Sequence, residues 1–124
     1  MKKKPNNNLG NLNLSASDIS AILCALPLVT EIDANSPQQN LLNVRSCESA
    51  GRKISNHAAN ISAEEIRVIS IAVSAAVCII SGNDIDWLPD IDAEWKSELS
   101  KHFFTLNRLD PIFQNFVDEI YNRL

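Results

Sequence analysis

Six carboxylates gather in one short stretch of the chain, and carboxylate oxygens are the ligands that calcium prefers. They lie within residues 84–98 and are Asp84, Asp86, Asp90, Asp92, Glu94 and Glu98. An EF-hand loop also needs Gly at position 6 and an acidic ligand at position 12. Counting from Asp84 puts Pro89 and Trp95 at these positions, and counting from Asp90 puts Trp95 and Lys101 there. Neither register fits, so we expect no metal site.

The same carboxylates surround large apolar side chains, a composition that favours contact with a partner protein. Trp87 and Trp95 lie among them, and tryptophan is enriched at the centre of protein interfaces. The competing interpretation is that the carboxylates cap a helix while each tryptophan fills the core. The candidate partner-binding residues are Asp84, Asp86, Trp87, Asp90, Asp92 and Trp95.

The histidines and cysteines show no spacing that is typical of catalysis or metal binding. His57 and His102 have no carboxylate or cysteine at triad or ligand spacing. Cys24, Cys47 and Cys78 are odd in number and form no CxxC pair, which argues against a disulfide framework and against structural zinc. We therefore expect reduced thiols in a cytoplasmic protein.

The chain also lacks the GxSxG, HExxH, P-loop and GxGxxG motifs. The sequence therefore assigns no catalytic residue and implies no cofactor. Because active sites assemble in three dimensions, enzymatic activity stays open at this point, with its absence favoured.

A second polar group offers an alternative site. Arg67, Ser70 and Ser74 follow one another at spacings of three and four residues and form a polar seam along one side of an apolar helix. Such a seam can line a pocket for a small ligand or substrate. Its competing interpretation is structural, because buried serines commonly bond to nearby backbone carbonyls and an arginine in the first turn can reach solvent.

The polar seam belongs to the most apolar segment, which we predict to be a central helix over residues 62–81. Twelve of the fifteen residues at 66–80 are apolar or cysteine, so nearly every side must be covered. Ser62 and Glu65 have the spacing of a capping box, and Gly82 suits the end of a helix. At about 1.5 Å per residue the apolar run is shorter than the roughly 30 Å core of a bilayer, so we expect no membrane span.

Further helices are predicted on either side of the central one. A capping box at Ser15 opens the first, which Pro27 should end near residue 26. Ser36 opens a second, running to about residue 59. Asp90 or Asp92 should cap a fourth, with Trp95, Leu99, Phe103 and Leu106 along one side, and Asp110 with Pro111 should start a last one. The prediction is an all-α, single-domain bundle of four to five helices over residues 14–124, preceded by a flexible basic arm at 1–13.

The net charge of the chain argues against one class of partner and leaves three functional hypotheses. The formal net charge is −4 and the acidity is concentrated at 84–98, which argues against a nucleic-acid partner because phosphate binding needs clustered Lys and Arg. The leading hypothesis is a small soluble protein of bacterial or phage type without enzymatic activity. It would bind a protein partner or a second copy of itself, as inhibitor or immunity proteins do. The alternatives are a helical bundle with ligand-binding or enzymatic activity and, third, a helix-turn-helix-like DNA-binding regulator using Lys101–Arg108.

Overall fold

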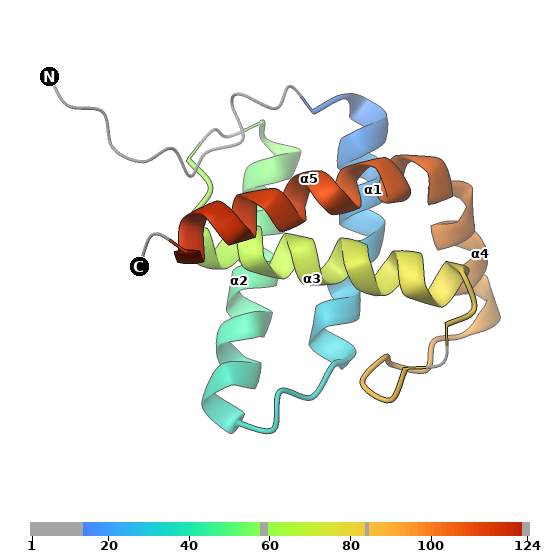
Figure 1. The fold of residues 1–124 in the computed structure, drawn as a ribbon, viewed down its shortest axis with the longest axis horizontal. Coiled ribbons are helices and arrows are strands. Elements are labelled where there is room, and N and C mark those ends of the chain that lie inside the picture. Colours follow the sequence, from blue (N-terminus) through green and yellow to red (C-terminus); the bar gives the residue numbers. More distant parts are fainter. Residues whose placement is uncertain (1–13, 58–59, 84, 123–124) are drawn as a thin grey trace, which may run out of the picture.

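The computed structural model describes residues 14–57, 60–83 and 85–122, and every regular element in these ranges is a helix (Figure 1). The elements in chain order are α1 (Ala16–Ala25), the 3₁₀ helix η2 (Leu26–Glu31), α2 (Pro37–Ser55), α3 (Ala63–Ile80), α4 (Ala93–Lys101) and α5 (Phe103–Asn122). The all-α prediction is therefore confirmed. The basic arm predicted at 1–13 lies outside the described residues.

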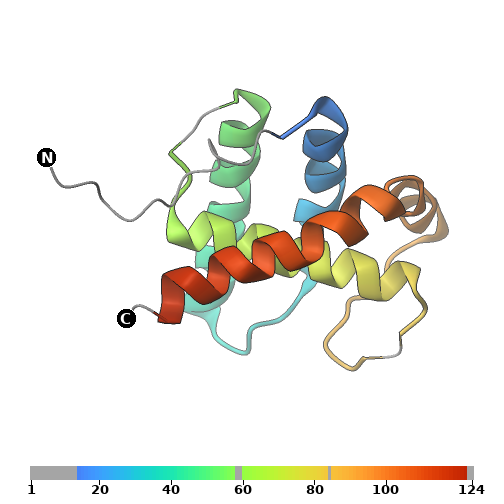
Figure 2. The ribbon, with the colours of Figure 1, turned by 45° about the horizontal axis from the view of Figure 1, so that its top comes forward.

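Helix α3 lies at the centre of the bundle, as the apolar pattern predicts. Helix α5 runs along it, α1 and α2 stand side by side across it, and α4 lies at one end (Figures 1 and 2). Helices α3 and α5 pack against each other along their length. Each contributes large, fully buried side chains to the core, which are Ile66, Val68, Ile69 and Val73 from α3 and Leu106, Leu109 and Phe113 from α5. The packing of α3 on α5 thus forms the main part of the core.

A single chain covers most of the apolar surface of α3. Nine residues of this helix are buried, and the apolar ones among them are fully covered: Ile66, Val68, Ile69, Ala72, Val73, Ala75 and Ala76. Apolar side chains stay partly exposed at Ile71 and, toward the C-terminal end, at Val77, Cys78, Ile79 and Ile80. Burial of the central helix therefore does not require a second copy of the chain.

Both predicted capping boxes are present, and each also joins its helix to another. Asp18 accepts a hydrogen bond from the Ser15 amide at 3.0 Å and forms an ion pair with Arg108 of α5. Glu65 accepts from the Ser62 amide at 2.8 Å, from Lys53 at 2.9 Å and from the Ser49 hydroxyl, the last two on α2. The N3 carboxylates thus define the helix starts and connect α1 to α5 and α3 to α2.

The helix ends differ from the prediction in one case. Helix α3 ends as expected, with Gly82 at φ 77°. The backbone N–H of Gly82 donates a hydrogen bond to the Ile79 carbonyl and that of Asn83 donates to the Cys78 carbonyl, the pattern of a Schellman motif. Helix α2 ends at Ser55, earlier than the predicted residue 59. His57 has a left-handed φ of 56°, which ends the helix because that conformation cannot continue it.

The predicted helix start at Asp110 and Pro111 is wrong, because Pro111 lies inside the continuous helix α5. The break falls instead at His102, which separates α4 from α5 and divides the predicted stripe of Trp95, Leu99, Phe103 and Leu106 between two helices. Leu109 and Phe113 are fully buried on either side of the proline. Their packing outweighs the roughly 3 kcal/mol that an interior proline costs a helix.

Removing this proline should stabilise the protein. We expect Pro111→Ala to raise the free energy of unfolding by about 1–3 kcal/mol, because alanine restores a backbone donor and has the best helix propensity. Urea denaturation measures the change. The control is Pro37→Ala at the first position of α2, where proline is well tolerated and no gain is expected. Equal responses of the two variants would contradict the explanation.

Candidate binding surface

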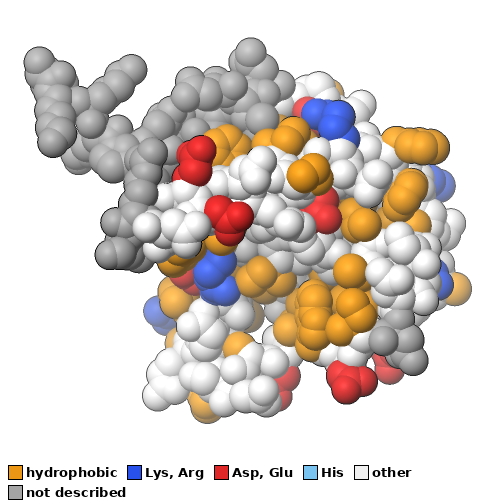
Figure 3. Space-filling model, viewed as in Figure 1, with side chains coloured by type: hydrophobic (Ala, Val, Ile, Leu, Met, Phe, Trp, Pro, Cys, Tyr) orange, Lys and Arg blue, Asp and Glu red, His pale blue; other side chains and the backbone are white. Residues whose placement is uncertain are grey.

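The structure divides the predicted partner-binding residues between the connector that joins α3 to α4 and the N-terminal part of α4. Asp86 and Asp90 of the connector are exposed, and 46% of Trp87 is accessible. Asp84 lies outside the described residues. Figure 3 shows apolar side chains gathered below α3, with carboxylates at the lower edge of that face. The connector therefore presents its tryptophan and two acids to solvent.

The other two predicted residues, Asp92 and Trp95, have structural contacts as well. Asp92 is the N-cap of α4 and accepts a hydrogen bond from the Trp95 amide at 2.7 Å. The indole N–H of Trp95 donates to the Cys24 carbonyl of α1 at 3.1 Å, which fixes the ring between the two helices. Helix capping, the competing interpretation of the acidic segment, thus holds for Asp92, while Trp95 attaches α4 to α1.

Asp92 and Trp95 also line a hollow of about 620 Å³ between α1 and α4. Its apolar lining comes from Leu23, Cys24, Pro27 and Trp95, and its polar lining from Asp92, Glu94, Glu98 and His102. We call this set of residues the acidic hollow. Three carboxylates thus stand around an apolar surface that contains a tryptophan.

The carboxylates of the acidic hollow are open to solvent and only partly paired. Glu98 accepts a hydrogen bond from Lys101 at 2.8 Å, which holds the pKa of Glu98 below its ordinary value. Asp92 and Glu94 lie at the N-terminus of α4, where the helix dipole favours negative charge. The three carboxylates therefore give this surface a negative charge that can attract cations.

The thiols of Cys24 and Cys47 are poorly suited to nucleophilic chemistry. Burial raises the pKa of Cys24, and the charge of Glu98 raises it further. Burial also raises the pKa of Cys47, to about 11, and this thiol lies 3.6 Å from the Leu26 carbonyl as a hydrogen-bond donor. Because the thiolate is the reactive form, both cysteines are largely inert near neutral pH.

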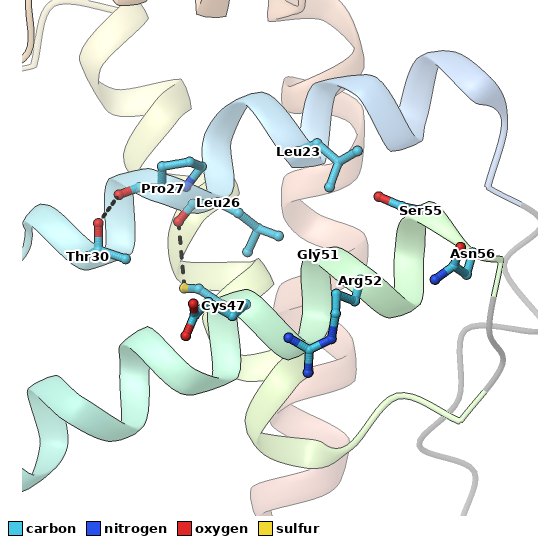
Figure 4. Close-up of a pocket in the computed structure, with 10 residues that line it drawn as sticks. Leu23, Leu26, Pro27, Thr30, Cys47, Gly51, Arg52, Ser55 and Asn56 are labelled. Atoms are coloured by element: carbon cyan, nitrogen blue, oxygen red, sulfur yellow. Dashed lines mark hydrogen bonds between the residues drawn. The ribbon is translucent and has the colours of Figure 1, made fainter.

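A second hollow adjoins the acidic hollow on the other side of α1. This groove of about 490 Å³ lies between α1 and α2 and shares Leu23 and Pro27 with the acidic hollow. Figure 4 shows Leu23 of α1 and Leu26 of η2 pointing toward α2 in the region of Gly51. Its remaining lining residues are Thr30, Cys47, Glu48, Arg52, Ser55 and Asn56. We call this the α1/α2 groove.

Arg67, the first residue of the polar seam, takes part in a network between helices. It donates to Glu64 on its own helix at 2.6 Å and to the Asn43 side chain of α2. The hydrogen bond from Arg67 lowers the pKa of Glu64, and its guanidinium is correspondingly held charged. Tyr121 of α5 adds a longer hydrogen bond to Glu64, at 3.4 Å. Arg67 therefore joins α3 to neighbouring helices.

The two serines of the polar seam also lie at helix contacts. Ser74 donates to the Asp110 carboxylate of α5, which also accepts from Gln114 at 2.9 Å. Ser70 is buried. In the described part of the chain, no buried side-chain nitrogen or oxygen lacks a hydrogen-bond partner. Neither the acidic hollow nor the α1/α2 groove includes a residue of the polar seam.

Within residues 14–57, 60–83 and 85–122, no group of three or more His, Cys, Asp or Glu side chains is placed to hold a metal ion. None of the described helices is long and apolar enough to cross a membrane. Comparisons with protein-family models, with curated proteins and with solved structures find no significant match.

Sequence reasoning found Asp92 and Trp95 but not the surface to which they belong. Glu94 and Glu98 are one helical turn apart, and Glu98 lies three residues after Trp95, a spacing that places it near that ring. This signal was present in the acidic segment. The contribution of Leu23, Cys24 and Pro27 had no local signal, because their contact with α4 spans about seventy residues of chain.

Proposed function

We propose that the protein is a non-enzymatic protein-binding module and that its partner has a basic segment with apolar side chains. The acidic hollow is the binding surface. The observation that carries the proposal is the placement of three carboxylates, Asp92, Glu94 and Glu98, around the apolar lining of Leu23 and Trp95. Free cysteines, of which Cys47 is buried, support a reducing compartment such as the cytoplasm.

The chemistry of the acidic hollow supports binding better than catalysis. A tryptophan next to charged groups is the composition of a binding hot spot with a polar rim. Its indole is already held by the Cys24 carbonyl, so little side-chain entropy is lost when a partner covers it. The neighbouring Cys24 thiol is protonated, and the carboxylates lie in an open surface that does not exclude water.

Charge reversal tests the proposal. Tagged wild-type protein and the double variant Glu94→Lys with Glu98→Lys are used to capture proteins from a lysate of the native host. We expect a basic protein that the wild type retains and that the variant loses by about tenfold or more, because the variant replaces attraction with repulsion. Quantitative mass spectrometry at two salt concentrations measures the retention, which should be weaker at high salt.

The control carries the same charge change elsewhere. Asp118→Lys with Glu119→Lys places two lysines on an exposed part of α5 and should retain the partner. A partner that is held equally by wild type and by both double variants would contradict the assignment of the surface, as would a complete absence of retained basic proteins. Trp87→Ala in the wild-type background shows whether the connector extends the same surface.

A further inference from the structure

The acidic hollow and the α1/α2 groove meet at the C-terminal end of α1. Leu23 and Pro27 belong to both, so apolar side chains continue from Cys47 on α2 across α1 to Trp95 on α4. We infer that the basic segment of the partner is an amphipathic α-helix that lies across both hollows, an inference that rests on the proposed function. Its apolar stripe covers Leu23 and Pro27, and its basic residues follow the flank that faces α4.

A helix suits this surface because it satisfies its own backbone hydrogen bonds. An extended peptide gains affinity by pairing its backbone with the free edge of a sheet. In the ranges that the structure describes, the regular elements are all helices, whose backbone groups bond within each helix. A partner backbone therefore finds no edge to pair with, whereas an amphipathic helix needs only an apolar groove for side chains three and four residues apart.

Gly51 lines the α1/α2 groove at a position that has room for a methyl group. A β-carbon built at this position would lie 3.8 Å from Leu23 Cδ2 and 3.9 Å from Leu26 Cδ1, which is ordinary van der Waals contact. Glycine inside a helix costs about 1 kcal/mol relative to alanine. The position thus accepts alanine, while a longer side chain would enter the groove and take the place of a partner side chain.

The charges on the two flanks differ and set the chemistry of the helix. On the α4 side, Asp92, Glu94 and Glu98 are all negative. On the α2 side, Glu48 and Arg52 are one turn apart and opposite in sign, so they cancel. Charge complementarity therefore selects a helix with lysine or arginine on the flank facing α4 and uncharged polar residues on the flank facing α2.

Peptide titrations of the full isotope-labelled chain, followed by NMR, test this inference. The probe is an eighteen-residue helical peptide with a leucine stripe, lysine on one flank and glutamine on the other. One comparison peptide has glutamate in place of lysine, and another has the same composition in scrambled order. The reporters are the Gly51 amide and the Trp95 indole N–H, because they lie on the α1/α2 groove and the acidic hollow respectively. We expect the lysine peptide to shift both and to bind about tenfold or more tightly than either comparison peptide, a difference of about 1.4 kcal/mol.

Gly51 variants separate this inference from the proposed function. Gly51→Leu should weaken binding of the lysine peptide by about tenfold through loss of the groove, whereas Gly51→Ala should change it by less than about threefold. Circular dichroism and thermal melts verify that both variants fold. Binding that is unchanged in Gly51→Leu but lost in Glu94→Lys with Glu98→Lys would overturn the helix inference and leave the proposed function standing. Binding that is insensitive to all these changes, preferred for the glutamate peptide, or absent up to millimolar peptide would overturn the inference as well.

Discussion

Replacing Phe113 by alanine should lower the free energy of unfolding by about 3–5 kcal/mol, the range measured when a buried phenylalanine is truncated. Phe113 is fully buried on α5, the helix that packs along α3, and its ring lies beside that of Phe116 with centroids 6.0 Å apart. The substitution removes apolar surface from the core and leaves a cavity that its neighbours fill only in part. Because a domain of this size has about 5–15 kcal/mol of stability in total, the loss should be evident in urea denaturation.

Phe104 supplies a control of the same residue type on the same helix. It is 87% exposed and contacts the edge of Phe103, with centroids 5.7 Å apart. Phe104→Ala should therefore change stability by no more than about 0.5–1 kcal/mol. A comparable loss in both variants would mean that the packing of α5 on α3 is not the main source of stability.

Replacing Glu65 by alanine should cost about 2–4 kcal/mol, because three donors lose the same buried acceptor. The carboxylate accepts hydrogen bonds from the Ser62 amide, the Ser49 hydroxyl and Lys53, and it is only 4% exposed. The variant removes one half of the capping box of α3 and leaves the Lys53 cation without its partner. Glu119→Ala, on the exposed side of α5, should be nearly neutral.

The contribution of Glu65 should also depend on pH. Burial by itself raises the pKa of this carboxyl, but the hydrogen bonds from Ser49, Ser62 and Lys53 bring it below its ordinary value of 4.5. A carboxyl with a lowered pKa in the folded state stabilises the protein fully above its unfolded pKa, and the contribution is lost as pH falls through the folded value. The stability difference between wild type and Glu65→Gln should therefore be constant between about pH 6 and 8 and shrink below about pH 4.5. A difference that grows in acid would contradict the assignment.

Local patterns in the sequence predict much of the fold. The capping boxes at Ser15 and Ser62 and the glycine at 82 each involve groups a few residues apart, so their chemistry is readable without a structure. The central position of α3 follows from its composition, because a helix that is apolar on nearly every side must be surrounded. Pro111 shows the limit of local reasoning, since its helix-breaking tendency is outweighed by side chains that pack on another helix.

The candidate site depends more strongly on tertiary structure. The sequence identifies an acidic segment with two tryptophans, but it does not distinguish Trp87, which is exposed, from Trp95, which is fixed against Cys24. Likewise, the polar seam is visible as a periodicity, whereas its hydrogen bonds to Asn43 and Asp110 come from helices distant in the chain.

By itself, then, the sequence determined where α1, α2 and α3 begin, which helix is central and where negative charge accumulates, because these depend on short-range spacing and composition. Tertiary structure alone decided that Glu94, Trp95 and Glu98 of α4 stand beside Leu23 of α1, and that Gly51 of α2 lines an adjoining groove. Periodicity specifies which face of a helix is buried but not which helix covers it. That choice arises from the simultaneous packing of all the helices, and the proposed binding surface exists only where two of them meet.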